Sequence, residues 1–201
     1  MNLTYLSALP LLLALRLAGT PAEDPKPGPA DLGKPAPAFE LKSLDGKTVK
    51  LADFKDKLVV LEWFNPNCPY CEYAYGEGGP LRDYPEQLRS KGGVWLTVVS
   101  EKPDNPGGDP ENIKRFVAEN KMKAPVLLDP EGKVGKMYGA KTTPHMFVIS
   151  EKGVLVYRGA LDNAPRGKVE KGNTRANYVQ AAIADLSSGH TVTTAETKPY
   201  G

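Results

Sequence analysis

Two kinds of hydrophobic pattern alternate along the chain, and they predict strands interleaved with helices. The turn dipeptide Asp45-Gly46 separates two segments of alternating polarity, which predicts a β-hairpin over residues 39–51. The nearly continuous apolar runs 58–64 and 94–99 are typical of strands that are buried on both faces of a sheet. Shorter strands are predicted at 126–128, 146–149 and 154–157.

Helical patterns lie between and after these strands. Residues 71–89 are helical in character, although glycines and a proline interrupt them. Pro110 opens a second helix, and residues 133–138 form a short third one. Residues 175–186 form a last, amphipathic helix. The order of hairpin, βαβαβ, hairpin and helix predicts a single α/β domain.

The N-terminal segment is typical of an export signal. An apolar run over residues 3–17 precedes the small residues of Thr20-Pro21-Ala22, which form a plausible cleavage site. A short uncleaved membrane anchor is the alternative, but about 15 apolar residues is brief for a span. We therefore expect a periplasmic or extracellular protein with no stable membrane insertion after signal removal. The expected organisation is a signal peptide at 1–22, a Pro-rich linker at 23–33, a domain at 34–190 and a polar tail at 191–201.

Charge and cysteine content narrow the function classes. The 201 residues carry a formal net charge of only +2, with basic and acidic side chains interspersed, so we expect no nucleic-acid partner. Only two cysteines are present, and they are too close in sequence to staple a distant loop. They cannot form a four-cysteine zinc site, and neither His145 nor His190 has metal-site spacing. We expect no bound metal.

The two cysteines are the strongest candidates for chemistry. Cys68 follows a buried strand and opens a helix, where free backbone N–H groups and the helix dipole stabilise a thiolate. Pro69 suits a first helical turn, and Cys71 lies one turn further on. The pair can cycle between dithiol and disulfide, with Cys68 attacking and Cys71 resolving. Half of a zinc site, or an inert buried pair, remains an alternative at this point.

Glu62 and the dipeptide Thr143-Pro144 are two further candidates for the site. Glu62 sits inside the apolar run before Cys68, where burial would raise its pKa and suit it to proton transfer. The alternative is that its side chain reaches solvent or an arginine at the end of the sheet. Thr143-Pro144 directly precedes a strand, either as a plain turn or as a cis-proline.

These residues together resemble the thioredoxin superfamily, within it the exported redoxin or thiol-specific-antioxidant-like branch, over residues 34–190. The resemblance rests on a strand followed by Cys68-Pro69-Tyr70-Cys71 and a helix, and on Thr143-Pro144. It implies a thioredoxin-like fold, a central mixed β-sheet flanked by helices, with Pro144 cis beside Cys68. It also places Glu62 where thioredoxins carry a buried acid. The implied catalytic residues are Cys68, Cys71, Glu62 and Pro144, and the implied substrate contacts are Thr143, Pro69, Tyr70 and Trp63.

The resemblance predicts an extracytoplasmic thiol–disulfide oxidoreductase with a redox-active Cys68–Cys71 disulfide. Its substrates would be protein thiols and disulfides, served by a separate redox partner, and we expect a monomer without a cofactor. A thiol peroxidase with Cys68 as the peroxidatic residue is one alternative. The peroxiredoxin pattern PxxxTxxC is not met, because Leu61 and Asn65 occupy the proline and threonine positions. A non-catalytic binding module is another alternative, against which the intact cysteine pair argues.

Overall fold

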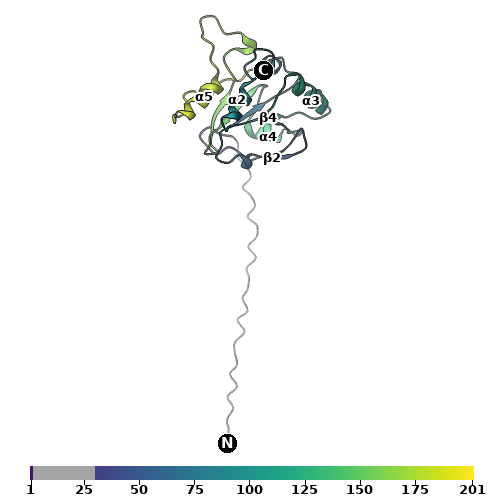
Figure 1. Ribbon diagram of the computed structural model, residues 1–201, viewed down its shortest axis with the longest axis vertical. Helices are drawn as coiled ribbons and strands as arrows, with labels where there is room; N and C mark the ends of the chain where they lie inside the picture. Colours follow the sequence, from purple (N-terminus) through teal and green to yellow (C-terminus); the bar gives the residue numbers. More distant parts are fainter. Residues whose placement is uncertain (2–29) are drawn as a thin grey trace.

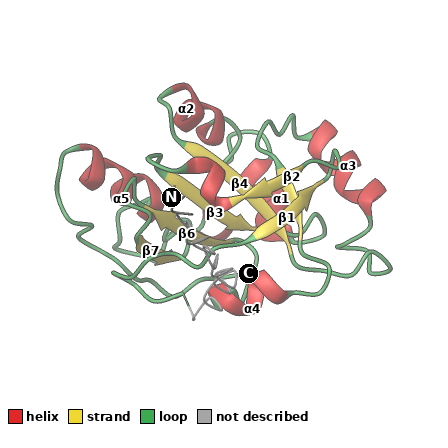
Figure 2. Ribbon diagram, turned by 90° about the horizontal axis from the view of Figure 1, so that it is seen from below, coloured by secondary structure: helices red, strands yellow, loops and turns green. Residues whose placement is uncertain are grey.

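The computed structural model describes Met1 and residues 30–201. Residues 30–201 form a twisted β-sheet with helices on both faces (Figures 1 and 2). The predicted signal peptide beyond Met1, and the predicted linker up to residue 29, lie outside the described residues. The strands are β1 (Glu40–Ser43), β2 (Thr48–Lys50), β3 (Val59–Trp63), β4 (Val94–Val99), β5 (Val126–Leu128), β6 (His145–Ile149) and β7 (Leu155–Gly159). The helices are α1 (Pro69–Tyr75), α2 (Tyr84–Ser90), α3 (Pro110–Glu119), α4 (Lys133–Tyr138) and α5 (Tyr178–Ser187), with 3-10 turns at Leu51–Phe54 and Pro165–Gly167.

The strands form one mixed sheet in the order β2-β1-β5-β4-β3-β6-β7. β3 and β5 both pair in parallel with β4, whereas β6 runs antiparallel to β3 and to β7. The N-terminal hairpin joins the sheet through β1, which is antiparallel to β5. This is the mixed α/β sheet that the resemblance implied, with β3, the strand before the cysteines, in its interior.

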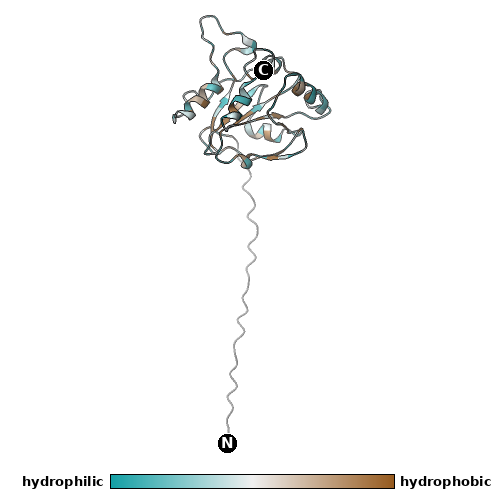
Figure 3. Ribbon diagram, in the orientation of Figure 1, coloured by the Kyte–Doolittle hydropathy of each residue, from teal (hydrophilic) through white to brown (hydrophobic). Residues whose placement is uncertain are grey.

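The period-two alternation of β3 divides the core into two layers. Val60 and Phe64 face a cluster that includes side chains of α1, α2, α3 and α5. Leu61 and Trp63 face the other cluster, which α4 covers through Val134 and Tyr138. Figure 2 shows α4 on one side of the sheet and α2 and α3 on the other, and Figure 3 shows hydrophobic and hydrophilic positions side by side on α3 and α5.

The predicted helix at 71–89 is two helices, and the first begins two residues earlier. α1 ends at the Gly76 cap, and the chain then folds so tightly that a Cβ on Gly79 would lie 2.7 Å from the carbonyl carbon of Ala74. The last helix begins at Tyr178, three residues later than predicted. Asn177 caps it, because its side-chain oxygen accepts a hydrogen bond from the Gln180 N–H at 2.9 Å.

Residues 191–201, expected to be a polar tail, pack against the domain. The backbone N–H of Arg158 in β7 donates to the Ala195 carbonyl at 3.0 Å, and the N–H of Thr197 donates back to the Arg158 carbonyl at 3.1 Å. The tail therefore covers the free edge of β7, and its end lies in the same region as the cysteines. Exposed strand edges are otherwise sites of unwanted pairing.

Candidate active site

Cys68 is the N-cap of α1, which follows β3 after a short loop. The Asn65 carbonyl accepts from the Cys68 N–H at 3.1 Å, and the Cys68 carbonyl accepts from the Glu72 N–H at 2.9 Å. Pro69 occupies the first turn, as predicted. Cys68 is partly exposed and Cys71 is buried, and both are free thiols. The sheet thus delivers one accessible and one covered sulfur at the same helix end.

The two thiols have pKa values displaced in opposite directions. The pKa of Cys68 is lowered to about 5, chiefly by a hydrogen bond from the Cys71 thiol, then by one from the Thr143 side chain and by the backbone N–H groups of Cys71 and Tyr70, while partial burial opposes the shift. The pKa of Cys71 is raised well above its ordinary value, first by burial and then by its bond to Cys68 and the nearby Glu62 carboxylate. Cys68 is therefore the thiolate, and Cys71 holds its proton.

The loop before β6 lies directly against Cys68. The Thr143–Pro144 peptide bond is cis, as the resemblance implied. Thr143 places its carbonyl oxygen 2.8 Å from the Cys68 sulfur. Pro144 is buried, while Thr143 stays half-exposed. β6 pairs with β3 so that His145 opposes Trp63, and this register brings the two distant segments together.

Glu62 is fully buried on the same face of the sheet as α1. Its Oε2 accepts a hydrogen bond from the Tyr75 hydroxyl and another from Trp95 Nε1 at 2.9 Å. Burial raises the pKa of Glu62 to about 7, against the opposing effect of these bonds. Among the described residues, Glu62 Oε1 and the hydroxyl of neighbouring Thr97 have no hydrogen-bond partner. The expected burial and raised pKa of Glu62 are thus found, and no arginine among the described residues pairs with it.

Trp63 belongs mainly to the opposite face of the sheet. It is 3% exposed, its ring lies 5.0 Å from that of Phe147, and its Nε1 donates to the Ser100 hydroxyl at 2.9 Å. Strand alternation explains this, since Glu62 and Trp63 must point to opposite faces. Trp63 does contribute to the wall of an open cleft of about 430 Å³ that Thr143 and Gly201 also line.

The other two expected substrate contacts lie on α1. Pro69 is exposed, and Tyr70 is half-buried. The Tyr70 ring lies 5.6 Å from that of Tyr200, at the end of the tail. Both residues therefore stand at the rim of the Cys68 site, and Tyr200 belongs to that rim as well.

A polar loop covers the residues that precede Cys68. Asn65 donates through its side-chain amide to Glu101 Oε1 at 3.1 Å, and its own side-chain oxygen accepts from the Asn67 N–H at 2.8 Å. Asn112 of α3 donates to Asn67 Oδ1 at 2.9 Å. These bonds hold the turn that leads into the helix, so they position the Cys68 sulfur.

Sequence reasoning missed three residues of this region. Tyr75, one turn after Cys71 on α1, could have been found from the i, i+4 spacing, which places both on one helix face. Trp95 lies on β4 and Tyr200 in the tail, and neither carries a local pattern that points to the cysteines. Only the pairing of β3 with β4, and the docking of the tail, brings them in.

The rest of the described chain adds neither a metal centre nor a membrane span. Residues 30–201 contain no group of three or more histidine, cysteine, aspartate or glutamate side chains with metal-binding geometry. None of the described helices has the length and apolar composition needed to cross a bilayer.

A dithiol at a helix N-terminus, a cis-proline against it and a mixed sheet behind it define the class of thioredoxin-like thiol–disulfide oxidoreductases. The AhpC/TSA family matches residues 32–158, and the chain belongs to this family. Over 126 residues it is 31% identical to the thiol-disulfide oxidoreductase ResA of Bacillus thuringiensis, covering 63% of this chain and 68% of that protein.

Two further relatives cover more of the chain. A putative peroxiredoxin of Mycobacterium tuberculosis is 28% identical over 158 residues, which is 77% of this chain and 94% of the relative. The crystal structure of an uncharacterised conserved protein from Geobacillus kaustophilus superposes with a TM-score of 0.71 at 28% identity, over 85% of this chain and 94% of its own. The structural likeness therefore extends well beyond the segment around the cysteines.

Proposed function

We propose that this protein catalyses thiol–disulfide exchange outside the cytoplasm, with Cys68 as the attacking thiolate and Cys71 as the resolving thiol. The single observation that carries the proposal is the geometry of the pair: a partly exposed Cys68 at the N-terminus of α1, a buried Cys71 one turn further on, and a fully buried Glu62 on the same face of the sheet. The opposite displacement of the two thiol pKa values agrees with this arrangement. An inert pair of buried cysteines would need neither a stabilised thiolate nor a proton acceptor. The relative named ResA supports the same chemistry.

In the first step, the Cys68 thiolate attacks one sulfur of a substrate disulfide. The substrate S–S bond breaks, a mixed disulfide forms on Cys68, and the departing substrate sulfur leaves as a thiolate that takes a proton from water. Thr143 lies beside the partly exposed sulfur, Pro69 and Tyr70 follow it in the first turn of α1, and these three residues would contact the substrate. Pro144 holds the Thr143 carbonyl beside that sulfur, and Trp63 supports the cleft wall from beneath.

In the second step, Cys71 resolves the mixed disulfide. Glu62 accepts the Cys71 proton, and the resulting thiolate attacks Cys68 and releases the second substrate thiolate. The protein ends with a Cys68–Cys71 disulfide and the substrate gains two electrons. A separate thiol partner then reduces the pair, and the same steps in reverse would oxidise a substrate dithiol. No cofactor is needed, and a monomer suffices.

The mixed-disulfide lifetime tests this assignment. Cys71→Ser should trap a substrate on Cys68, and Glu62→Gln should lengthen the lifetime of the mixed disulfide in the otherwise intact protein. Glu72→Gln is the matched control, because Glu72 is exposed on the same helix next to Cys71. Rapid acid quenching followed by mass measurement gives the lifetimes. Equal lifetimes for the Glu62→Gln and Glu72→Gln variants would remove Glu62 from the mechanism.

Peroxide reduction is a second candidate, because one relative is a putative peroxiredoxin. The residue at the usual threonine position, Asn65, is engaged with Asn67 and Glu101. The Thr143 carbonyl oxygen, 2.8 Å from the Cys68 sulfur, is an acceptor, and the Thr143 side chain that also hydrogen-bonds Cys68 comes from the cis-proline loop and not from the PxxxTxxC position. We therefore expect oxidation by hydrogen peroxide to be slower than exchange with a disulfide. A faster peroxide reaction at equal concentration would favour the peroxidase.

Export rests on the apolar run at 3–17 and the small residues that follow it. N-terminal sequencing of the protein recovered outside the cytoplasm should begin after this run. Recovery of material that retains Leu11–Leu15 would favour the membrane-anchor alternative.

A further inference from the structure

We infer that the tail segment Thr197–Gly201 is a wall of the substrate site, and that Tyr200 in it is a specificity-determining residue. The ring of Tyr200 narrows access to Cys68, so that small disulfides and disulfides on slender, flexible peptides react in preference to those on broad folded surfaces. This inference rests on the proposed function and adds the substrate class to it.

The tail is held along β7 by side chains as well as by backbone. The Thr197 hydroxyl accepts a hydrogen bond from the Ala160 N–H at 2.9 Å and lies 2.6 Å from the Tyr157 hydroxyl. One residue earlier, Glu196 pairs with Arg158 at 2.8 Å. Together with the two backbone bonds to Arg158, these contacts fix the direction in which the tail approaches the cysteines.

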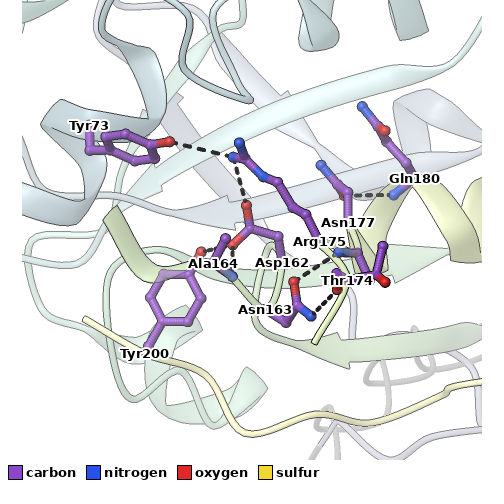
Figure 4. A network of polar contacts seen from close by, with 10 residues as sticks. Tyr73, Asp162, Asn163, Ala164, Thr174, Arg175, Asn177, Gln180 and Tyr200 are labelled. Atoms are coloured by element: carbon purple, nitrogen blue, oxygen red, sulfur yellow. Dashed lines mark hydrogen bonds and ion pairs between the residues drawn. The ribbon is translucent and has the colours of Figure 1, made fainter. Parts of the chain in front are cut away.

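Tyr200 has an anchor of its own, a buried carboxylate. Its hydroxyl donates to Asp162 Oδ1 at 2.5 Å, and Asp162 is 1% exposed. The other carboxylate oxygen, Oδ2, lies 3.4 Å from the Arg175 guanidinium, which also reaches the hydroxyl of Tyr73 on α1 (Figure 4). A buried carboxylate needs such partners, so the Tyr200 hydroxyl has an energetic reason to stay in place.

The end of the tail touches both sides of the Cys68 rim. The Tyr200 ring packs on Tyr70, at 5.6 Å between centroids. Gly201 lies so close to the backbone of Thr143 that an added Cβ would sit 2.7 Å from the Thr143 carbonyl carbon. Since the Thr143 carbonyl is the group beside the Cys68 sulfur, the tail lies next to the reacting atom.

An open cleft lies beside this rim, on the side of Thr143 and Gly201. The loop around Glu101 and the turn at Asn65 border the cleft of about 430 Å³, whose wall includes Lys141, Thr143 and Gly201. Because the tail lies against Tyr70 on one side and Thr143 on the other, a flat protein surface would meet the tail before the Cys68 sulfur, whereas a narrow chain could lie along this cleft. This placement of the tail is the reason for inferring that Tyr200 limits how wide a substrate can reach Cys68.

If the tail served only to cover the edge of β7, the residues up to Thr197 would be enough. The bonds of Thr197 and of the Arg158 backbone accomplish that before the chain reaches Tyr200. The placement of an aromatic ring on Tyr70, secured by a separate carboxylate, serves the rim and not the strand edge. The two roles can therefore be separated by a change at Tyr200 alone.

The test compares Tyr200→Ala with the intact protein as reductants of oxidised glutathione and of insulin disulfides. We expect the rate ratio of insulin to glutathione to rise about 2- to 10-fold, the range that loss of one aromatic pair allows. Tyr178→Ala, at a half-buried tyrosine of α5, is the matched control and should leave the ratio unchanged. Tyr200→Phe keeps the ring and loses the bond to Asp162, so it should give a smaller rise.

The outcomes separate this inference from the proposed function. If the intact protein reduces neither disulfide, the proposed function fails. If it reduces both and Tyr200→Ala leaves the ratio unchanged, or lowers it, Tyr200 does not restrict substrate width and the inference is overturned. Equal retention of folded far-UV circular dichroism in all variants confirms that the ratio reports on the site.

Discussion

The low pKa of Cys68 gives a reaction profile whose size can be worked out. With a pKa of about 5, half of Cys68 is thiolate at pH 5, whereas a thiol at the ordinary 9.0 is about 0.01% ionised there. The fraction of thiolate is thus ~5000-fold larger for Cys68 at pH 5. The gain in rate is ~40- to 100-fold smaller than this, because the nucleophilicity of a thiolate falls with its pKa at a Brønsted slope of about 0.4–0.5. Cys68 should react about 50- to 125-fold faster than the ordinary thiol at pH 5, and at nearly the same rate at pH 7.

Replacing Cys71 tests the cause of this shift. Its thiol donates the hydrogen bond that contributes most to lowering the pKa of Cys68. Cys71→Ala should therefore move the pKa of Cys68 upward by about one to two units, the worth of a hydrogen bond to a charged group. Cys71→Ser keeps a donor in place and should give a smaller change.

The assay is alkylation by iodoacetamide from pH 4 to 10, followed by mass measurement of the labelled peptide. The reduced intact protein should show one midpoint near pH 5, with label on Cys68, since Cys71 is buried and holds its proton. A midpoint near pH 9, preferential labelling of Cys71, or identical midpoints for the Cys71→Ala and Cys71→Ser variants would refute the reasoning.

Three stability predictions complete the set. Because burial raises the pKa of Glu62 from 4.5 to about 7, the unfolded state releases this proton first as pH rises, so the free energy of unfolding falls by about 3 kcal/mol between these values. The Glu62→Gln variant should not show this loss, so in urea titration it should be more stable than the intact protein at pH 8 but not at pH 4. The same stability difference at both pH values would contradict the raised pKa of Glu62. Asn177→Ala should cost about 1 kcal/mol through the lost cap of α5, also by urea titration, and a neutral result would mean that the cap is replaced by water. Gly79→Ala should cost about 1–3 kcal/mol in the same titration, because its Cβ would meet the backbone of Ala74, which cannot swing away as a side chain can; unchanged stability would mean that this turn opens freely.

Local sequence patterns determined most of the sheet and the place of Cys68. The strands of the hairpin, β3 and β4 follow alternation or continuous apolar runs, which depend only on neighbouring residues. Cys68 at the start of α1 follows from a buried strand that ends before a proline-containing first turn. These features were predictable because each depends on a few consecutive positions.

The helix boundaries were less predictable because capping decides them. Asn177 ends the loop before α5 through one hydrogen bond to Gln180, while the apolar pattern by itself extends the helix to earlier residues. The break between α1 and α2 is likewise set by the close approach of Gly79 to Ala74. A periodic pattern reports the face of a helix more reliably than its ends.

The surroundings of the two sulfurs depend on contacts between residues far apart in the chain. The pairing of β3 with β4 brings Trp95 to Glu62, and the pairing of β3 with β6 brings Thr143 to Cys68. The sequence indicated a buried acid and a candidate cis-proline, but neither their partners nor their distances. Composition likewise marked 191–201 as a polar tail, while the tertiary structure places Tyr200 at the rim of the site. Polar side chains carry no periodic signal for where they dock, because a single buried carboxylate such as Asp162 can hold them wherever the fold brings the two together.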